Sequence, residues 1–139
     1  MAVHWKKKIG LHHVCLRVQD VETTVRFYKE ALNAQLVYEW GPEGTDDHGI
    51  LLDLGEGDII EIFHTSTAFS MGPWQHIAVY TNDIKASYNK ALTCGARPNT
   101  EPGYAEFFNS NGDLVKIYYA FVDAPGNETI EFIQNLLDD

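Results

Sequence analysis

One pattern occurs twice in this chain and constrains its fold more than any other feature. The segment 10–20, GLHHVCLRVQD, alternates apolar and polar residues as a half-buried β-strand does. The segment 74–83, WQHIAVYTND, repeats the design. In both copies a histidine opposes the apolar side of the strand, and an aspartate follows it at the same spacing. The pairs are His13 with Asp20 and His76 with Asp83. Two such strands predict that both histidines serve one shared polar site.

The repeat extends through both halves of the sequence. Each aspartate occupies an N-cap position before a helical pattern, over 20–33 and 83–93. Three strands are expected after each helix, at 35–40, 50–54 and 59–65, then at 106–109, 115–122 and 129–134. The chain therefore predicts an α+β fold of two tandem βαβββ modules, about 10–66 and 73–136, within a single domain spanning 1–139.

Composition narrows the class of protein. The chain has 139 residues, 45% of them hydrophobic, which is enough for one packed core. A formal charge of −10 argues against nucleic-acid binding, which needs a basic face. No apolar run is long enough to cross a membrane, and the N-terminus lacks the apolar stretch of a secretory signal. With only Cys15 and Cys94, a reducing, cytoplasmic location is expected.

The closing strand of each half holds one glutamate between apolar residues. Glu61 lies in the segment IIEIF, and Glu131 lies in TIEFI. Because side chains alternate along a strand, both carboxylates are expected opposite the core, as are His13 and His76. A carboxylate among Ile and Phe is costly unless it is paired or coordinated. Two His and two Glu at equivalent places predict a divalent metal site, without selecting among Zn, Ni, Co, Fe and Mn.

The remaining histidines fit this site less well. His12 neighbours His13, but it lies on the apolar side of the strand pattern, and the second copy has Gln75 there. Three others have no counterpart in the repeat, so surface or local hydrogen-bonding roles are expected for them. They are His4, His48 and His64. An isolated His or Glu on a strand is usually structural or exposed, so the metal-site hypothesis depends on the repeat.

At these residues the chain resembles the vicinal oxygen chelate superfamily, which contains glyoxalases, bleomycin resistance proteins and dioxygenases. The resemblance covers about 11–134 and is nearest to glyoxalase I. The segment 13–20, followed by Phe27-Tyr28 and Leu32, is similar to the opening of bacterial glyoxalase I. The segment 120–134 resembles the closing Asp-Pro-x-Gly-x-x-Ile-Glu run, with one extra residue. This resemblance implies paired βαβββ modules whose mixed sheets curve into a cup around a divalent metal.

The resemblance also implies a role for each site residue. The metal ligands would be His13, Glu61, His76 and Glu131. Glyoxalase I is a lyase that isomerises the hemithioacetal of a 2-oxoaldehyde and glutathione through a metal-stabilised enediolate. A ligand carboxylate moves the proton; Glu131 is chosen here, and Glu61 is the symmetric candidate that sequence does not separate from it. Arg17 matches the arginine that meets the glutathione carboxylate.

The chain departs from glyoxalase I at other substrate positions. Thr65 stands where the family has a glutathione-contacting Asn. The region 101–116 does not follow the glyoxalase pattern, and Lys116 is either a substrate contact or an ordinary strand residue. The candidate substrate-binding residues are therefore Arg17, Thr65 and Lys116. Glu61 still favours glyoxalase I, because methylmalonyl-CoA epimerases usually have Gln at that position.

Other functions remain open on the same fold. One is an epimerase, and another is an extradiol dioxygenase that would hold Fe(II) or Mn(II) with His13, His76 and Glu131. A third is a metal-free protein that binds or sequesters a small molecule. A homodimer is expected, because these modules often complete their cup with a partner chain. The sequence does not decide whether the site forms within one chain or across two.

Overall fold

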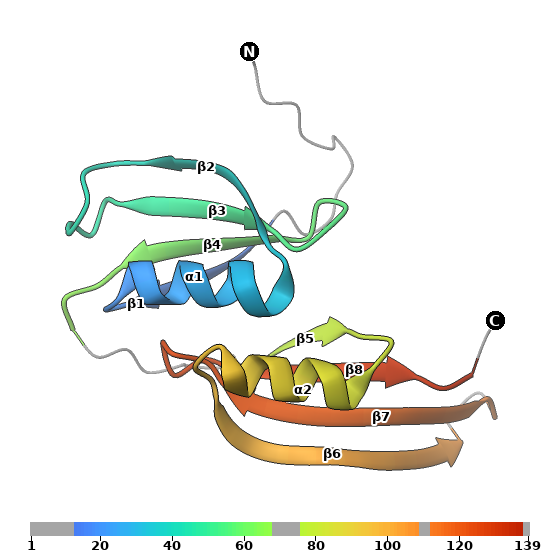
Figure 1. The fold of residues 1–139 in the computed structure, drawn as a ribbon. Helices are drawn as coiled ribbons and strands as arrows, with labels where there is room; N and C mark the ends of the chain where they lie inside the picture. Colours follow the sequence, from blue (N-terminus) through green and yellow to red (C-terminus); the bar gives the residue numbers. More distant parts are fainter. Residues whose placement is uncertain (1–12, 68–75, 109–111, 138–139) are drawn as a thin grey trace.

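A computed structural model describes residues 13–67, 76–108 and 112–137 of the chain. Its first half runs β1 (His13–Val18), α1 (Val21–Leu32), β2 (Gln35–Trp40), β3 (Gly49–Asp53) and β4 (Ile59–His64). The four strands form one sheet in the order β1-β4-β3-β2 (Figure 1). β1 is parallel to β4, and the other neighbours are antiparallel. The parallel pair sets the histidine-bearing strand beside the glutamate-bearing one.

The second half repeats this topology. It runs β5 (Ile77–Tyr80), α2 (Ile84–Thr93), β6 (Arg97–Phe108), β7 (Leu114–Asp123) and β8 (Thr129–Asn135). The second sheet has the order β5-β8-β7-β6, with β5 parallel to β8. Two four-stranded mixed sheets, each with one helix, confirm the predicted α+β fold of two βαβββ modules.

Both helices begin at the predicted caps. A carboxylate oxygen of Asp20 accepts a hydrogen bond from the backbone N–H of Thr23 at 3.0 Å. Asp83 accepts one from the backbone N–H of Ala86 at 3.1 Å. These bonds satisfy amide groups that have no partner within the helix. The bond from Thr23 also lowers the pKa of Asp20, because it stabilises the ionised carboxylate.

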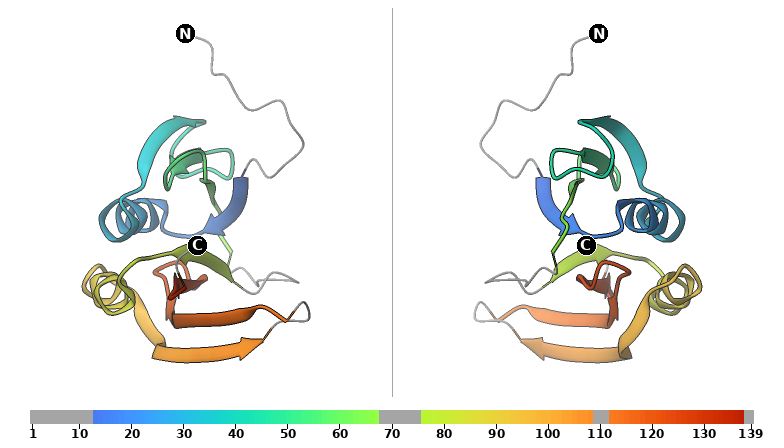
Figure 2. Two further views of the ribbon diagram at one scale, coloured as in Figure 1. Left: turned by 90° about the vertical axis from the view of Figure 1, so that its right-hand side faces the viewer. Right: turned by 90° about the vertical axis from the view of Figure 1, so that its left-hand side faces the viewer.

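One hydrophobic core joins the two modules. Both views in Figure 2 place α1 and α2 next to each other on the same side of the molecule. The core takes side chains from both helices and from strands of both sheets. Its largest fully buried members include Phe27, Tyr28, Leu52, Ile62, Ile130 and Phe132. Each sheet therefore packs one face against the core, and the polar residues of the repeat lie on the other face.

β6 is longer than the sequence indicates. The sequence predicts a strand at 106–109, whereas the structure extends it from Arg97 to Phe108. Pro98, Pro102 and Gly103 normally interrupt strands. Here β6 lies at the sheet edge, and its pairing with β7 shifts register twice, between residues 98 and 100 and between 100 and 103. An edge strand with bulges accommodates prolines, because one side of it needs no ladder hydrogen bonds.

The other predicted strands agree with the structure to within about two residues where it describes them. The predicted link at 66–73 and the turn at 111–113 fall partly outside the described residues, as do Leu11, His12 and Gln75. None of the helices in 13–67, 76–108 and 112–137 is long and apolar enough to cross a membrane.

Candidate functional site

The first module brings His13 and Glu61 together. The histidine Nε2 lies 3.3 Å from the glutamate Oε1. Their strands are parallel neighbours in which Cys15 stands opposite Glu61, so His13 lies one strand repeat before the carboxylate. The two side chains are 33% and 15% exposed. This pair therefore lies on the accessible face of the first sheet.

The second module contains an almost identical pair. His76 Nε2 lies 3.2 Å from Glu131 Oε1, and the side chains are 34% and 16% exposed. His76 immediately precedes β5, and Ala78 stands opposite Glu131. The repeat in the sequence thus becomes a repeat in three dimensions, in which each half supplies one imidazole and one carboxylate.

Alternation along the strands explains why both glutamates reach this face. Ile60 and Ile62 flank Glu61 and are buried, and Ile130 and Phe132 do the same around Glu131. The apolar neighbours point into the core, so each intervening carboxylate points the opposite way. This is the arrangement that the sequence predicts for the four residues.

Cys15 stands opposite Glu61 in the pairing of β1 with β4. Partial burial, and after it the hydrogen bond and negative charge of the Glu61 carboxylate, raise the pKa of its thiol to about 11. The thiol is not in a disulfide. At neutral pH this side chain is therefore an uncharged S–H group beside a carboxylate.

Phe121 distinguishes the second pair from the first. It stands opposite Glu131 in the pairing of β7 with β8, and its ring meets the His76 ring edge-on, with centroids 5.3 Å apart. The equivalent position in the first sheet, opposite Glu61, holds the buried Leu51. An aromatic ring against the imidazole restricts the orientations that His76 adopts.

Arg17 projects from the same strand as His13. Its guanidinium lies 4.8 Å from the centre of the Phe63 ring and donates to the His64 carbonyl at 3.2 Å. Arg17 and Thr65 both line a cavity of about 180 Å³, and residues 125–127 of the second module line it as well. Two of the three predicted substrate-binding residues thus share one cavity.

Lys116, the third predicted substrate contact, is not brought to either pair. It stands opposite Glu106 in the pairing of β7 with β6. Alternation along β7 turns its side chain to the face opposite that of Phe121. The sequence alone could not place it, because the face depends on where the strand register begins.

Two other histidines form local contacts. His48 is buried, and its Nε2 lies 3.2 Å from a carboxylate oxygen of Glu39. The Nδ1 of His64 lies 3.2 Å from a carboxylate oxygen of Asp46. These are the local hydrogen-bonding roles that the sequence favours for both residues, although a surface position is wrong for His48.

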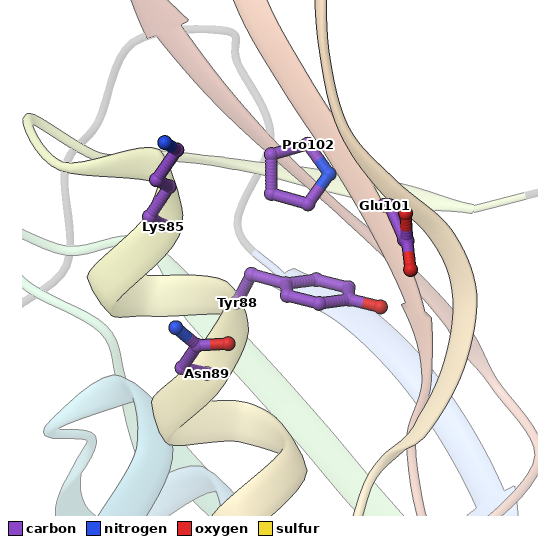
Figure 3. Close-up of a pocket in the computed structure, with 5 residues that line it drawn as sticks. All are labelled: Lys85, Tyr88, Asn89, Glu101 and Pro102. Atoms are coloured by element: carbon purple, nitrogen blue, oxygen red, sulfur yellow. The ribbon is translucent and has the colours of Figure 1, made fainter.

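A second cavity, of about 300 Å³, lies between α2 and β6. Figure 3 shows the Tyr88 ring reaching from the helix toward Glu101 on the strand, with Pro102 beside it. Neither His–Glu pair lines this cavity. It opens where β6 bulges, at the prolines that made this strand hard to recognise.

The donor chemistry of the two pairs suits a divalent metal, but each pair supplies only half of a site. Imidazole nitrogen and carboxylate oxygen are common ligands of Zn, Ni, Co, Fe and Mn, which take four to six donors. Among the described residues, no three His, Cys, Asp or Glu side chains are grouped so that they could hold a metal ion. The four predicted ligands thus fit a metal only if the two pairs come together.

Comparison with known proteins gives a consistent family. A profile of the "Glyoxalase/Bleomycin resistance protein/Dioxygenase superfamily" matches residues 10–132. A probable lactoylglutathione lyase of Vibrio parahaemolyticus is 30% identical over 131 residues, which cover 88% of each chain. A probable lactoylglutathione lyase of Vibrio cholerae matches with the same identity and coverage.

Solved structures share the fold at lower identity. The trypanothione-dependent glyoxalase I of Leishmania major has a TM-score of 0.69 and 20% identity, over 91% of this chain and 87% of that one. The fosfomycin resistance protein FosX of Listeria monocytogenes has a TM-score of 0.66 and 17% identity, over 94% and 96%. A FosX structure that contains Mn(II) has a TM-score of 0.62 and 18% identity, over 88% and 87%. At these identities the likeness concerns the fold.

Proposed function

Because the chain belongs to the glyoxalase, bleomycin resistance protein and dioxygenase superfamily, we propose that it is a metal-dependent lyase of the glyoxalase I type. The substrate would be the hemithioacetal of a 2-oxoaldehyde and a thiol. The two equivalent His–Glu pairs carry this proposal. The lyase names of the two Vibrio relatives support it.

Four residues would hold one divalent ion. They are His13, Glu61, His76 and Glu131. A bound ion would supply positive charge that stabilises an oxyanion on the substrate. Zn, Ni, Co, Mn and Fe all fit this donor set.

The two pairs would meet across a homodimer. Each pair is a two-donor half-site on an accessible sheet face, and no third ligand of the described chain joins it. In a dimer with two-fold symmetry, the first-module pair of one copy would face the second-module pair of the other. Such an assembly would contain two equal sites of four ligands each.

Glu131 would be the residue that moves the proton. The reaction needs a base that takes a proton from one carbon and returns it to the next. A carboxylate that is 16% exposed and lies 3.2 Å from His76 Nε2 can reach a substrate in front of the sheet. Glu61 has the same geometry toward His13 and is the alternative base.

Arg17 and Thr65 would hold the thiol portion of the substrate. Their shared cavity of about 180 Å³ offers a guanidinium and a hydroxyl to a carboxylate-bearing group. The Nη1 of Arg17 already donates to the His64 carbonyl, which fixes the direction of the side chain. Thr65 lacks the side-chain amide that Asn would offer to glutathione, so the thiol carrier need not be glutathione. We place the reaction in the cytoplasm, where such thiols are abundant and Cys15 and Cys94 stay reduced.

Metal content tests the site directly. Purified wild-type protein should hold about one divalent ion per chain after loading with Ni, Co, Zn or Mn, because each chain contributes four ligands to two shared sites. Glu131→Gln and Glu61→Gln should each reduce metal content and abolish turnover of methylglyoxal with glutathione or another thiol. Elemental analysis and a coupled absorbance assay measure the two quantities.

Glu101→Gln, on the exposed surface of β6, is the matched control and should keep both the metal and the activity. A wild-type protein that binds none of these metals would refute the catalytic proposal and favour a metal-free binding protein. A metal-loaded protein that consumes oxygen with a catechol would instead be a dioxygenase.

A further inference from the structure

The cavity between α2 and β6 is lined by polar side chains that the proposed lyase reaction does not use. Its volume of about 300 Å³ lies at the lower end of the range for small-molecule sites, and neither His–Glu pair borders it. Part of the lining comes from one face of α2, because side chains three and four positions apart lie together on a helix. These residues are Lys85, Tyr88 and Asn89.

The opposite wall of the cavity is a bulge in β6. The pairing of β6 with β7 shifts register between residues 98 and 100 and again between 100 and 103. Glu101 and Pro102 lie in this interval and have no partner residue on β7. Figure 3 shows both residues across the cavity from α2. The bulge thus turns a carboxylate and an apolar ring toward the helix.

Tyr88 distinguishes this cavity from an ordinary surface hollow. It is only 7% exposed, and its ring belongs to the hydrophobic core. Figure 3 shows the ring extending from α2 so that its hydroxyl lies on the side of Glu101. Among the described residues, this hydroxyl has no hydrogen-bond partner. A tyrosine buried to this degree usually bonds its hydroxyl to another group, so the free hydroxyl indicates a ligand.

The charges around this hydroxyl are of opposite sign. Lys85 contributes an ammonium group from the helix, and Glu101 contributes a carboxylate from the strand. Neither forms a salt bridge with any residue in the described part of the chain. The lining is therefore neutral as a whole but divided between a positive and a negative side. Such a division fits a ligand that carries one carboxylate and one ammonium group.

We propose that this cavity binds a small aliphatic α-amino acid. The ligand's carboxylate would bind the Lys85 ammonium group and the Asn89 side-chain amide. Its ammonium group would bind the Glu101 carboxylate and donate to the Tyr88 hydroxyl oxygen. The rings of Tyr88 and Pro102 would pack against the aliphatic side chain. This inference is independent of the proposed metal site.

Binding of L-valine and two analogues tests the pairing of charges. Isovalerate lacks the ammonium group of valine, and isobutylamine lacks the carboxylate. We expect each analogue to bind about tenfold more weakly than valine, because each loses a charge-assisted hydrogen bond. Titration of isotope-labelled wild-type protein, followed by two-dimensional NMR, gives the dissociation constants. The backbone amides that respond should cluster around Tyr88 and Glu101.

Three variants match each ligand group to the side chain that binds it. Glu101→Gln should weaken valine binding about tenfold without weakening isovalerate binding, because isovalerate has no ammonium group. Lys85→Met should weaken valine binding about tenfold without weakening isobutylamine binding, because isobutylamine has no carboxylate. Tyr88→Phe keeps the ring in the core and should weaken valine binding about threefold, the effect of one hydrogen bond.

Two further variants are matched controls. Lys29→Met removes an exposed lysine of α1, and Tyr104→Phe removes the hydroxyl of an exposed tyrosine of β6. Neither side chain lines the cavity. Both variants should bind valine as wild type does.

The outcomes separate this inference from the proposed function. A protein that binds valine but no metal would contradict the lyase alone. If glycine, L-alanine and L-valine all fail to bind, the inference is overturned even in a metal-loaded, active protein. Valine binding that both Glu101→Gln and Lys85→Met leave unchanged would also overturn it, because the ligand would then occupy another place.

Discussion

At the scale of single residues, the most unusual group in the described chain is Glu128. The hydroxyl of Tyr28 on α1 donates to its Oε1 at 3.3 Å, so this bond links the two modules. Its Oε2 is buried and has no hydrogen-bond partner. Burial raises the pKa of Glu128, because the ionised form loses water that the hydrogen bond from Tyr28 replaces only in part.

This raised pKa predicts that Glu128 makes the free energy of unfolding larger at low pH than at neutral pH. The unfolded glutamate has the lower pKa, so the unfolded chain loses its proton first as the pH rises. The free energy of unfolding therefore falls between the unfolded and the folded pKa and is level above the latter. Glu128→Gln removes this contribution, so we expect the variant to gain about 1 kcal/mol relative to wild type between pH 4 and pH 7. Urea unfolding at several pH values measures the difference.

Glu101→Gln is the control for this experiment, because Glu101 is exposed on β6. Its stability relative to wild type should not change with pH. If the stability difference between Glu128→Gln and wild type is also independent of pH, Glu128 is not desolvated in solution. The contact between Tyr28 and Glu128 would then differ from the one described.

Residues within the repeat were predictable, and residues outside it were not. The sequence singled out His13, Glu61, His76 and Glu131, because each copy supports the other, and the structure places the His and Glu of each module next to each other. Their role as metal ligands stays a prediction. It did not identify Cys15 as a neighbour of Glu61, because that contact depends on the register between two strands separated by a helix and two other strands. Glu128 was missed for a related reason, since its burial follows from the packing of one module against the other.

At the scale of elements, the two capping aspartates hold the start of each helix. Asp83→Ala removes the acceptor for the Ala86 backbone N–H and should reduce the free energy of unfolding by about 1 kcal/mol. Asp83→Ser keeps a capping oxygen and should recover most of this loss. Equilibrium urea unfolding of the three proteins gives the values. Equal stability of Asp83→Ala and wild type would mean that the cap contributes nothing to the fold.

The elements also show where local patterns predict structure and where they fail. Helices and most strands follow from capping residues and alternation, which are properties of neighbouring residues. Local patterns do not predict β6 between Arg97 and Ala105, because its two prolines indicate an interruption of the strand. Its strand conformation comes from pairing with β7 at a sheet edge, where the missing N–H groups carry little cost.

At the scale of the whole molecule, the proposal that the site spans two chains makes a mixing prediction. One variant lacks the first pair (His13→Ala with Glu61→Gln), and another lacks the second (His76→Ala with Glu131→Gln). Each homodimer should be inactive. A heterodimer should contain one intact site, so an equal, fully exchanged mixture should recover about a quarter of wild-type activity per chain.

Mixing each variant with itself is the control, and size-exclusion chromatography confirms that the variants still assemble. Recovery of activity would support a site shared between chains. No recovery from chains that exchange freely would mean that both pairs act within one chain.

The exposure of the two pairs has a thermodynamic consequence. If a half-site with two donors binds an ion only when a second copy completes it, metal binding and assembly are linked equilibria. The bound ion would then stabilise the dimer, and dilution of the protein would lower its metal occupancy even at a constant concentration of free ion. A cell short of metal would lose the assembled form, and a cell making little of the protein would lose the metal.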